Sequence, residues 1–154
     1  MTDEPMLIDT NILVYAFDAD SGEKCTIAKD LLARCWRNEA RYAVSTQNLA
    51  EFSAVVREKV PRPVPAHDVR TFLEAVMRFK GWQVLSYDAG TVILAHEIRD
   101  KLGLHFWDAL LVATMEQNSI RTICTEDSNF LNVPWLSVIN PFTRQYYKTI
   151  ERND

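Results

Sequence analysis

Short apolar runs alternate along the chain with longer segments in which apolar residues recur every three or four positions. The short runs lack a strict alternation of polar and apolar residues, which is typical of strands buried on both faces. We expect strands at residues 6–8, 42–45, 83–85 and 122–125, with a fifth at 136–139. The longer segments predict helices at residues 12–17, 23–37, 46–59, 66–79, 88–101 and 106–116.

This order of strands and helices predicts an α/β fold. We expect a three-layer α/β/α sandwich with a central, mainly parallel sheet of about five short strands. Pro61, Pro63 and Pro65 interrupt the helical pattern, and we interpret that stretch as a loop rather than a domain boundary. A length of 154 residues favours one domain over residues 1–154.

The composition indicates a globular protein and argues against secreted, membrane and disulfide-rich proteins. Apolar residues make up 47% and charged residues 25% of the chain, as in an ordinary globular protein. The first residues lack a basic segment and no apolar run approaches membrane-spanning length, so we expect neither a signal peptide nor a membrane protein. Cys25, Cys35 and Cys124 are widely spaced, which argues against a disulfide framework or a thiolate zinc site and favours a cytoplasmic location. The net charge of -4 provides no general attraction for a polyanion.

Two aspartates directly follow predicted strands. Asp9 comes after the first strand and Asp127 after the fourth. The ligand crevice of an open parallel sheet lies at the carboxyl ends of its strands, so both side chains are candidates for a site there. The alternative is that each aspartate only caps a helix or turn, and for either residue taken singly that alternative stays open.

Two further acids lie on predicted helices. Glu51 lies at the edge of an apolar stripe, where a carboxylate either needs a partner or extends into solvent. Asp108 has apolar neighbours on its helix, and burial of an ionised carboxylate among them without compensation would cost several kcal/mol. Asp108 could instead be the N-cap of a helix that begins at Ala109.

Convergence of all four acids would require compensation. Two like charges about 4 Å apart repel by roughly 4 kcal/mol at an effective dielectric near 20. Mg²⁺ or Mn²⁺ would relieve this repulsion, because both ions prefer carboxylate oxygens as ligands and retain water. The spacing of the acids in the sequence does not by itself show that they converge.

Four sequence blocks resemble the motifs of PIN-domain proteins, and their order and separation match over nearly the whole chain. Residues 7–13, LIDTNIL, resemble the opening motif, and residues 45–52, STQNLAEF, the helix of the second acid. Residues 106–113, FWDALLVA, resemble the helix of the third acid, and residues 125–130, TEDSNF, the last motif. One departure is Asn129, since many relatives have an acid at that position, so Asp127 would be the only acid of the last motif to act in the site. Glu126 is the rival candidate, but it stands at the variable position of the motif.

The blocks look most like those of VapC-type toxins. That resemblance implies an endoribonuclease that uses Mg²⁺ or Mn²⁺ to cut RNA and leaves a 5′-phosphate and a 3′-hydroxyl. It also implies a homodimer and a VapB-like antitoxin whose C-terminal segment covers the active site. We expect Asp9, Asp108 and Asp127 to hold the metal, with Glu51 binding through water or orienting the attacking hydroxide. The alternative is a PIN scaffold that has lost catalysis and binds RNA or protein.

Further residues are candidates for supporting roles. Thr10, Asn11 and Thr125 are suited to hydrogen bonds that fix the carboxylates, although turns and caps explain them equally well. We expect His105 to be structural or solvated, with phosphate contact or proton transfer as the alternative. We expect residues 142–148 to form an ordinary surface segment, with contact to RNA or antitoxin as the alternative. Four basic side chains could contact the RNA backbone: Lys24, Arg57, Lys59 and Arg62.

Two other classes of protein are disfavoured. A phosphatase of the haloacid dehalogenase type needs a second Asp two positions after the first, and that position is Asn11. A phosphate-cradling nucleotide binder needs a Gly-rich loop before a helix, and the four glycines of this chain form no such loop.

Overall fold

The structure, a computed structural model, describes residues 4–143 of the chain. Its five strands are all parallel and lie in the order β3-β2-β1-β4-β5. They are β1 (Met6–Ile8), β2 (Tyr42–Ser45), β3 (Trp82–Leu85), β4 (Thr122–Cys124) and β5 (Ser137–Ile139). The prediction of an α/β fold around a parallel sheet is therefore confirmed, and the fifth strand is present.

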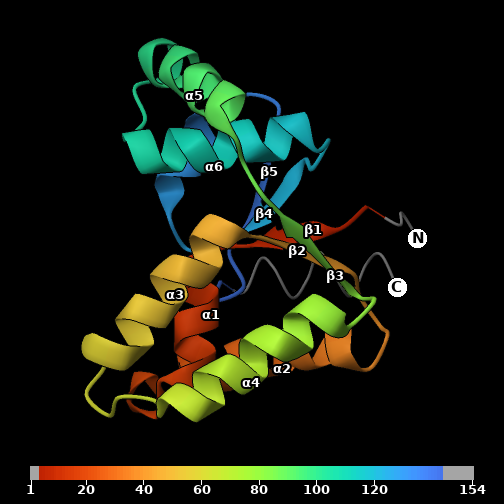
Figure 1. Cartoon of the computed structure of the whole chain (residues 1–154), viewed down its shortest axis with the longest axis vertical. Coiled ribbons are helices and arrows are strands. Elements are labelled where there is room, and N and C mark those ends of the chain that lie inside the picture. The colour runs from red at the N-terminus through yellow and green to blue at the C-terminus, as the bar shows by residue number, and fades with distance from the viewer. Residues whose placement is uncertain (1–3, 144–154) are drawn as a thin grey trace.

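In the described part of the chain, six helices surround the sheet (Figure 1): α1 (Thr10–Phe17), α2 (Glu23–Trp36), α3 (Thr46–Glu58), α4 (Ala66–Arg78), α5 (Ala89–Leu102) and α6 (Phe106–Gln117). All six are predicted by periodicity. Two 3₁₀ helices, η1 (Ala19–Ser21) and η2 (Ser128–Asn132), are not predicted, because three to five residues are too few to show a helical period.

Each face of the sheet has its own core. Leu7, Ala43 and Ile123 pack with side chains of α5 and α6. Their neighbours Ile8 and Cys124 point to the other face and pack with α1 to α4. Figure 1 shows these two helical groups on opposite sides of the strands. Burial on both faces explains why the strand sequences are apolar without alternation.

Local chemistry sets the ends of several helices. Asp9 is the N-cap of α1, which starts two residues earlier than the apolar pattern predicts. Gly103 ends α5 with a φ of 68°, in the left-handed region that glycine adopts without strain. The proline segment separates α3 from α4, as predicted.

Within residues 4–143, none of the helices has the length and apolar character needed to cross a lipid bilayer. Residues 1–3 and 144–154 lie outside the described residues. Most of the segment 142–148, which we expected to be an ordinary surface segment, is therefore not described. The assignment of residues 1–154 to one domain stays a prediction.

Candidate active site

Asp9 and Thr125 lie side by side at the carboxyl edge of the sheet. Ile8 and Cys124 are paired in register, and the next residue, Asp9, donates its backbone N–H to the carbonyl oxygen of Cys124 over 3.0 Å. The strand order reverses between β1 and β4, since β2 lies on the other side of β1. Such a reversal opens a crevice at the carboxyl ends of the strands.

The Asp9 side chain is 9% exposed and is held by three donors. Its Oδ1 accepts the backbone N–H of Thr10 over 2.8 Å, and its Oδ2 accepts the Thr125 hydroxyl over 2.8 Å. Asn48 Nδ2 lies 3.4 Å from Oδ1. Burial raises the pKa of Asp9 to about 6 and outweighs the opposing effect of the hydrogen bonds. The negative charges of Asp108 and Glu51 also raise this pKa.

Glu51 projects from α3 and is oriented by two side chains. Thr10 Oγ1 donates to Glu51 Oε2 over 3.1 Å, and Gln47 Nε2 donates to Glu51 Oε1 over 3.0 Å. The same Gln47 nitrogen donates to the carbonyl oxygen of Trp107 over 3.0 Å and so ties α3 to the start of α6. Glu51 is exposed, so both interpretations of this residue hold: it has partners, and water reaches it.

Asp108 lies in the first turn of α6 and is half-buried. The N-cap of this helix is His105, so the alternative in which Asp108 caps a helix beginning at Ala109 is wrong. Burial raises the pKa of Asp108, and the negative charge of Asp127 raises it further. The charge of His105 lowers this pKa, while that of Glu51 raises it.

Asp127 caps the 3₁₀ helix η2, since its Oδ1 accepts the backbone N–H of Asn129 over 2.9 Å. Its own N–H donates to Thr125 Oγ1 over 3.0 Å, next to Asp9. The rival acid Glu126 is engaged elsewhere. It accepts a hydrogen bond from the Tyr15 hydroxyl and forms an ion pair of 2.8 Å with Lys24.

The four acids therefore form one electrostatic group, which we call the carboxylate cluster: Asp9, Glu51, Asp108 and Asp127. The charges of Glu51 and Asp108 act on Asp9, and those of Glu51 and Asp127 act on Asp108. The ion pairs found among residues 4–143 all involve other acids, which are Asp20, Glu39 and Glu126.

The donor set of the carboxylate cluster fits a hard divalent cation in type, because Mg²⁺ and Mn²⁺ prefer carboxylate oxygens. The spacing is looser than that of a formed metal site. In the described part of the chain, no three His, Cys, Asp or Glu side chains are close enough together to hold an ion as they stand. Mutual repulsion of like charges favours this wider spacing.

Thr125 and Asn11 are connected to the carboxylate cluster by hydrogen bonds that end at Asp9. Thr125 is fully buried, and its hydroxyl accepts Asn11 Nδ2 over 3.2 Å while donating to Asp9. Asn11 Oδ1 is buried and has no hydrogen-bond partner among the described residues. The three residues predicted to fix the carboxylates thus all lie at the cluster, Thr10 through its contacts with Asp9 and Glu51.

Sequence reasoning missed Gln47 and Asn48. Asn48 Nδ2 donates to Thr10 Oγ1 over 3.0 Å, and its Oδ1 accepts the backbone N–H of Ser45 over 3.1 Å. A signal was available, because Ser45 followed by a polar residue three positions later is the pattern of a capping box. That pattern predicts the start of α3 but not the contact with Thr10.

Three of the four predicted RNA-contacting residues are engaged with other groups of the protein. Lys24 pairs with Glu126, and Arg62 Nε lies 3.5 Å from a carboxylate oxygen of Asp20. Arg57 Nη1 donates to the carbonyl oxygen of Val64 over 2.9 Å. Arg57 also lies six residues beyond the second acid, about 9 Å along α3. Contact of these side chains, and of Lys59 at the end of α3, with RNA stays a prediction.

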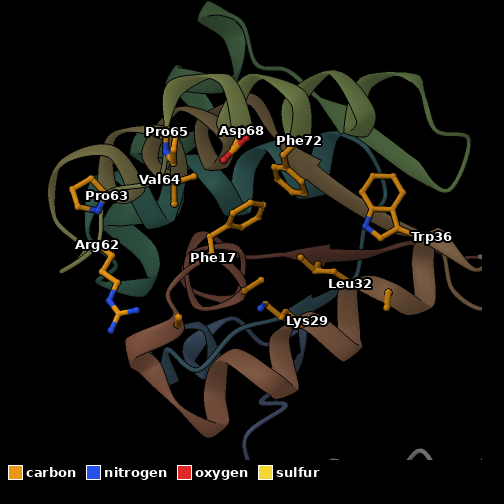
Figure 2. Close-up of a pocket in the computed structure, with 13 residues that line it drawn as sticks. Phe17, Lys29, Leu32, Trp36, Arg62, Pro63, Val64, Pro65, Asp68 and Phe72 are labelled. Atoms are coloured by element: carbon orange, nitrogen blue, oxygen red, sulfur yellow. The ribbon is translucent and has the colours of Figure 1, made fainter.

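A cavity of about 610 Å³ lies elsewhere in the molecule. Figure 2 shows its lining, in which Phe17, Leu32 and Phe72 come from α1, α2 and α4. Ala16, which also lines it, lies seven residues beyond Asp9, about 10 Å along α1. None of the four acids of the carboxylate cluster lines this cavity.

One family model matches most of the chain. The family model described as PIN domain matches residues 6–136. Among curated protein sequences no significant match is found.

Several solved structures have a similar fold. A toxin-antitoxin complex from Klebsiella pneumoniae contains a chain with 21% identity and a TM-score of 0.60; the match covers 89% of this chain and 98% of that one. VapC20 of Mycobacterium tuberculosis, described as a Sarcin-Ricin loop cleaving toxin, has 18% identity and a TM-score of 0.63, over 86% and 98% of the two chains. FitAcB from Neisseria gonorrhoeae has 19% identity and a TM-score of 0.59, over 89% and 98%. At these identities the likeness shows the fold alone.

Proposed function

The chain belongs to the PIN-domain family, and on that premise we propose that it is a metal-dependent endoribonuclease that hydrolyses phosphodiester bonds of RNA. The observation that carries this proposal is the carboxylate cluster at the carboxyl edge of the sheet. Its acids come from four separate segments of the chain and are electrostatically linked. A fold without a ligand there has no reason to bring these charges together.

Each residue of the cluster has a separate task in this proposal. Asp9, Asp108 and Asp127 would hold Mg²⁺ or Mn²⁺, and Thr125 keeps the Asp9 carboxylate in one orientation. When bound, the metal supplies positive charge opposite the phosphate and lowers the pKa of a water molecule. Glu51 is open to solvent, so it can orient the attacking water and accept its proton. In-line attack would leave a 5′-phosphate and a 3′-hydroxyl.

We further propose that the protein is the toxin of a VapBC-type pair, is a homodimer and acts in the cytoplasm. The support comes from solved structures of similar fold, among them a toxin-antitoxin complex from Klebsiella pneumoniae and DNA-bound VapBC from Salmonella typhimurium. The three cysteines are free and buried, which suits a reducing compartment. The antitoxin would be a VapB-like protein whose C-terminal segment covers the carboxylate cluster.

These partner proposals have simple tests. Sedimentation of the purified protein should give twice the mass of one chain, and a single-chain mass would exclude the homodimer. A small open reading frame directly upstream should encode a DNA-binding protein that suppresses RNA cutting when it is added back. If the encoded protein leaves cutting unchanged, it is not the antitoxin.

The competing function is a PIN scaffold without catalysis that binds RNA or protein. Purified protein freed of antitoxin should cut single-stranded RNA when Mn²⁺ or Mg²⁺ is present and should stop when EDTA is added. Asp9→Asn should abolish cutting without unfolding the protein, and Asp68→Asn, which removes an acid outside the cluster, should leave cutting unchanged. Equal cutting by Asp9→Asn and the wild type would mean that the site is wrong, and an inert wild type would favour the scaffold.

A further inference from the structure

Three aromatic rings on α5 and α6 contact one another in succession, and we call them the aromatic row: His96, Phe106 and Trp107. The rings of His96 and Phe106 have centroids 5.1 Å apart, and those of Phe106 and Trp107 are 5.6 Å apart. Trp107 is the residue directly before Asp108. The row therefore ends beside one of the four acids.

Trp107 is held in place by its backbone and by one ring contact, but most of its side chain is exposed to solvent. Its backbone carbonyl accepts the Gln47 hydrogen bond that also involves Glu51, so its main chain is tied to the cluster. Its ring meets Phe106 at an interplanar angle of 73°, an edge-to-face contact. Yet 59% of the residue remains exposed, and an aromatic side chain left in water forgoes the stabilisation that burial would give.

The position of Trp107 relative to Asp108 suits a nucleotide. Successive residues of a helix point about 100° apart, so the indole and the Asp108 carboxylate leave neighbouring positions of α6 in different directions. A base is likewise offset from its own phosphate. A phosphate held at the cluster would therefore leave a neighbouring base free to reach the indole.

The negative net charge of the protein is a further reason to expect RNA contacts that do not depend on positive charge. The net charge is -4, so the molecule has no general attraction for RNA. Lys24 and Arg62, two of the basic candidates, are engaged with carboxylates of this chain. Stacking of a base on an aromatic ring needs no positive charge, and it requires a base that is not paired within a helix.

We propose that Trp107 is a stacking platform for an unpaired nucleobase next to the scissile phosphate, with Phe106 supporting it and His96 extending the row. The proposal rests on the proposed ribonuclease function and adds a residue of this chain that receives a base of the substrate. The rings favour no particular base, because every base offers a π face.

Binding tests this proposal independently of catalysis. The probe is a labelled single-stranded oligoribonucleotide, measured by fluorescence anisotropy with Ca²⁺ in place of Mg²⁺ or Mn²⁺, and gel electrophoresis checks that it stays uncut. Trp107→Ala should weaken binding by between about 5-fold and about 150-fold, the range that loss of one stacked base gives. Trp107→Phe keeps a ring and should stay within about threefold of the wild type. For a fully paired duplex of the same sequence, Trp107→Ala and the wild type should bind alike.

Trp135→Ala is the matched control. Trp135 is 38% exposed and lies just before the amino end of β5, whereas Asp9 follows the carboxyl end of β1. The loss of Trp135 should therefore leave RNA binding unchanged. Equal binding of the single strand by Trp107→Ala and the wild type would overturn the proposal, even if the protein cuts RNA. A change of mass of Trp107→Ala on sedimentation would also overturn it, because Trp107 would then be an interface residue. Weakened binding by Trp107→Ala, together with a wild type that cuts no RNA, would keep the platform and reject the nuclease.

Discussion

At the scale of single residues, Asp9 is an N-cap and also belongs to the carboxylate cluster, although its sequence context offered a cap and a site as alternatives. Its Oδ1 accepts the N–H of Thr10 as the N-cap of α1, while its Oδ2 accepts the Thr125 hydroxyl. The two roles are compatible, because the start of a helix favours an anion. Asp127 likewise caps η2 and belongs to the cluster. A capping role therefore does not argue against a functional one here.

Thr125 allows a sharp test of how Asp9 is held. Thr125→Val keeps the shape of the side chain but removes the hydroxyl that donates to Asp9 and accepts from Asn11 and Asp127. We expect RNA cutting or Mn²⁺ affinity to fall by about 10- to 100-fold, as is typical when a group that orients a metal ligand is lost. Thr125→Ser should keep most of both. Wild-type cutting by Thr125→Val would show that this hydroxyl has no positioning role.

Glu126 and Asp127 can be separated by a matched pair of substitutions. Glu126→Gln weakens a partly exposed ion pair with Lys24, so we expect a loss of at most about 1 kcal/mol in the free energy of unfolding, with RNA cutting retained. Asp127→Asn should remove most of the cutting and leave stability nearly unchanged. The measurements are chemical denaturation and an RNA cleavage assay. The reverse pattern of activities would make Glu126 the fourth acid of the site.

The sequence predicted the acids better than the amides around them. A carboxylate after a buried strand or beside an apolar stripe is conspicuous in a single segment. The contacts of Asn48 with Thr10 and of Gln47 with Trp107 join residues 38 and 60 positions apart, so neither segment alone contains the information.

At the scale of elements, the start of α3 links the stability of a helix to the geometry of the cluster. Ser45 and Asn48 form a capping box, and Asn48 also contacts Thr10, which in turn donates to Glu51. The six helices were predictable because each shows a helical period. Some of their ends depend on local contacts that the period does not reveal, such as the start of α1 at Thr10, where Asp9 is the N-cap.

Asn48→Ala tests this link. The variant loses the reciprocal cap, and we expect the free energy of unfolding to fall by about 1–2 kcal/mol, together with a fall in RNA cutting because Thr10 loses a partner. The control is Ser53→Ala in the same helix, where the hydroxyl only donates to the carbonyl oxygen of Leu49. That change should alter stability by no more than about 0.5 kcal/mol. Equal stability and activity of Asn48→Ala and the wild type would contradict the link.

At the scale of the whole molecule, the sheet explains why distant acids meet. Apolar strands alternating with helices predict a parallel sheet covered on both faces, and hence one edge at which all carboxyl ends lie. The order β3-β2-β1-β4-β5 was not predictable, because it depends on which strands pair across the chain. Placing β1 beside β4 brings Asp9 next to Thr125, whose hydroxyl also accepts the N–H of Asp127, and no local pattern in the sequence specifies that neighbour.

The central claim is that the carboxylate cluster is one divalent-metal site, and calorimetric titration of the full-length protein with Mn²⁺ tests it most directly. We predict saturable binding by the wild type and by Asp68→Asn, with binding lost in Asp9→Asn and strongly weakened in Asp108→Asn and Asp127→Asn. Absence of Mn²⁺ binding by the wild type, or equal affinity in Asp9→Asn, would contradict the claim.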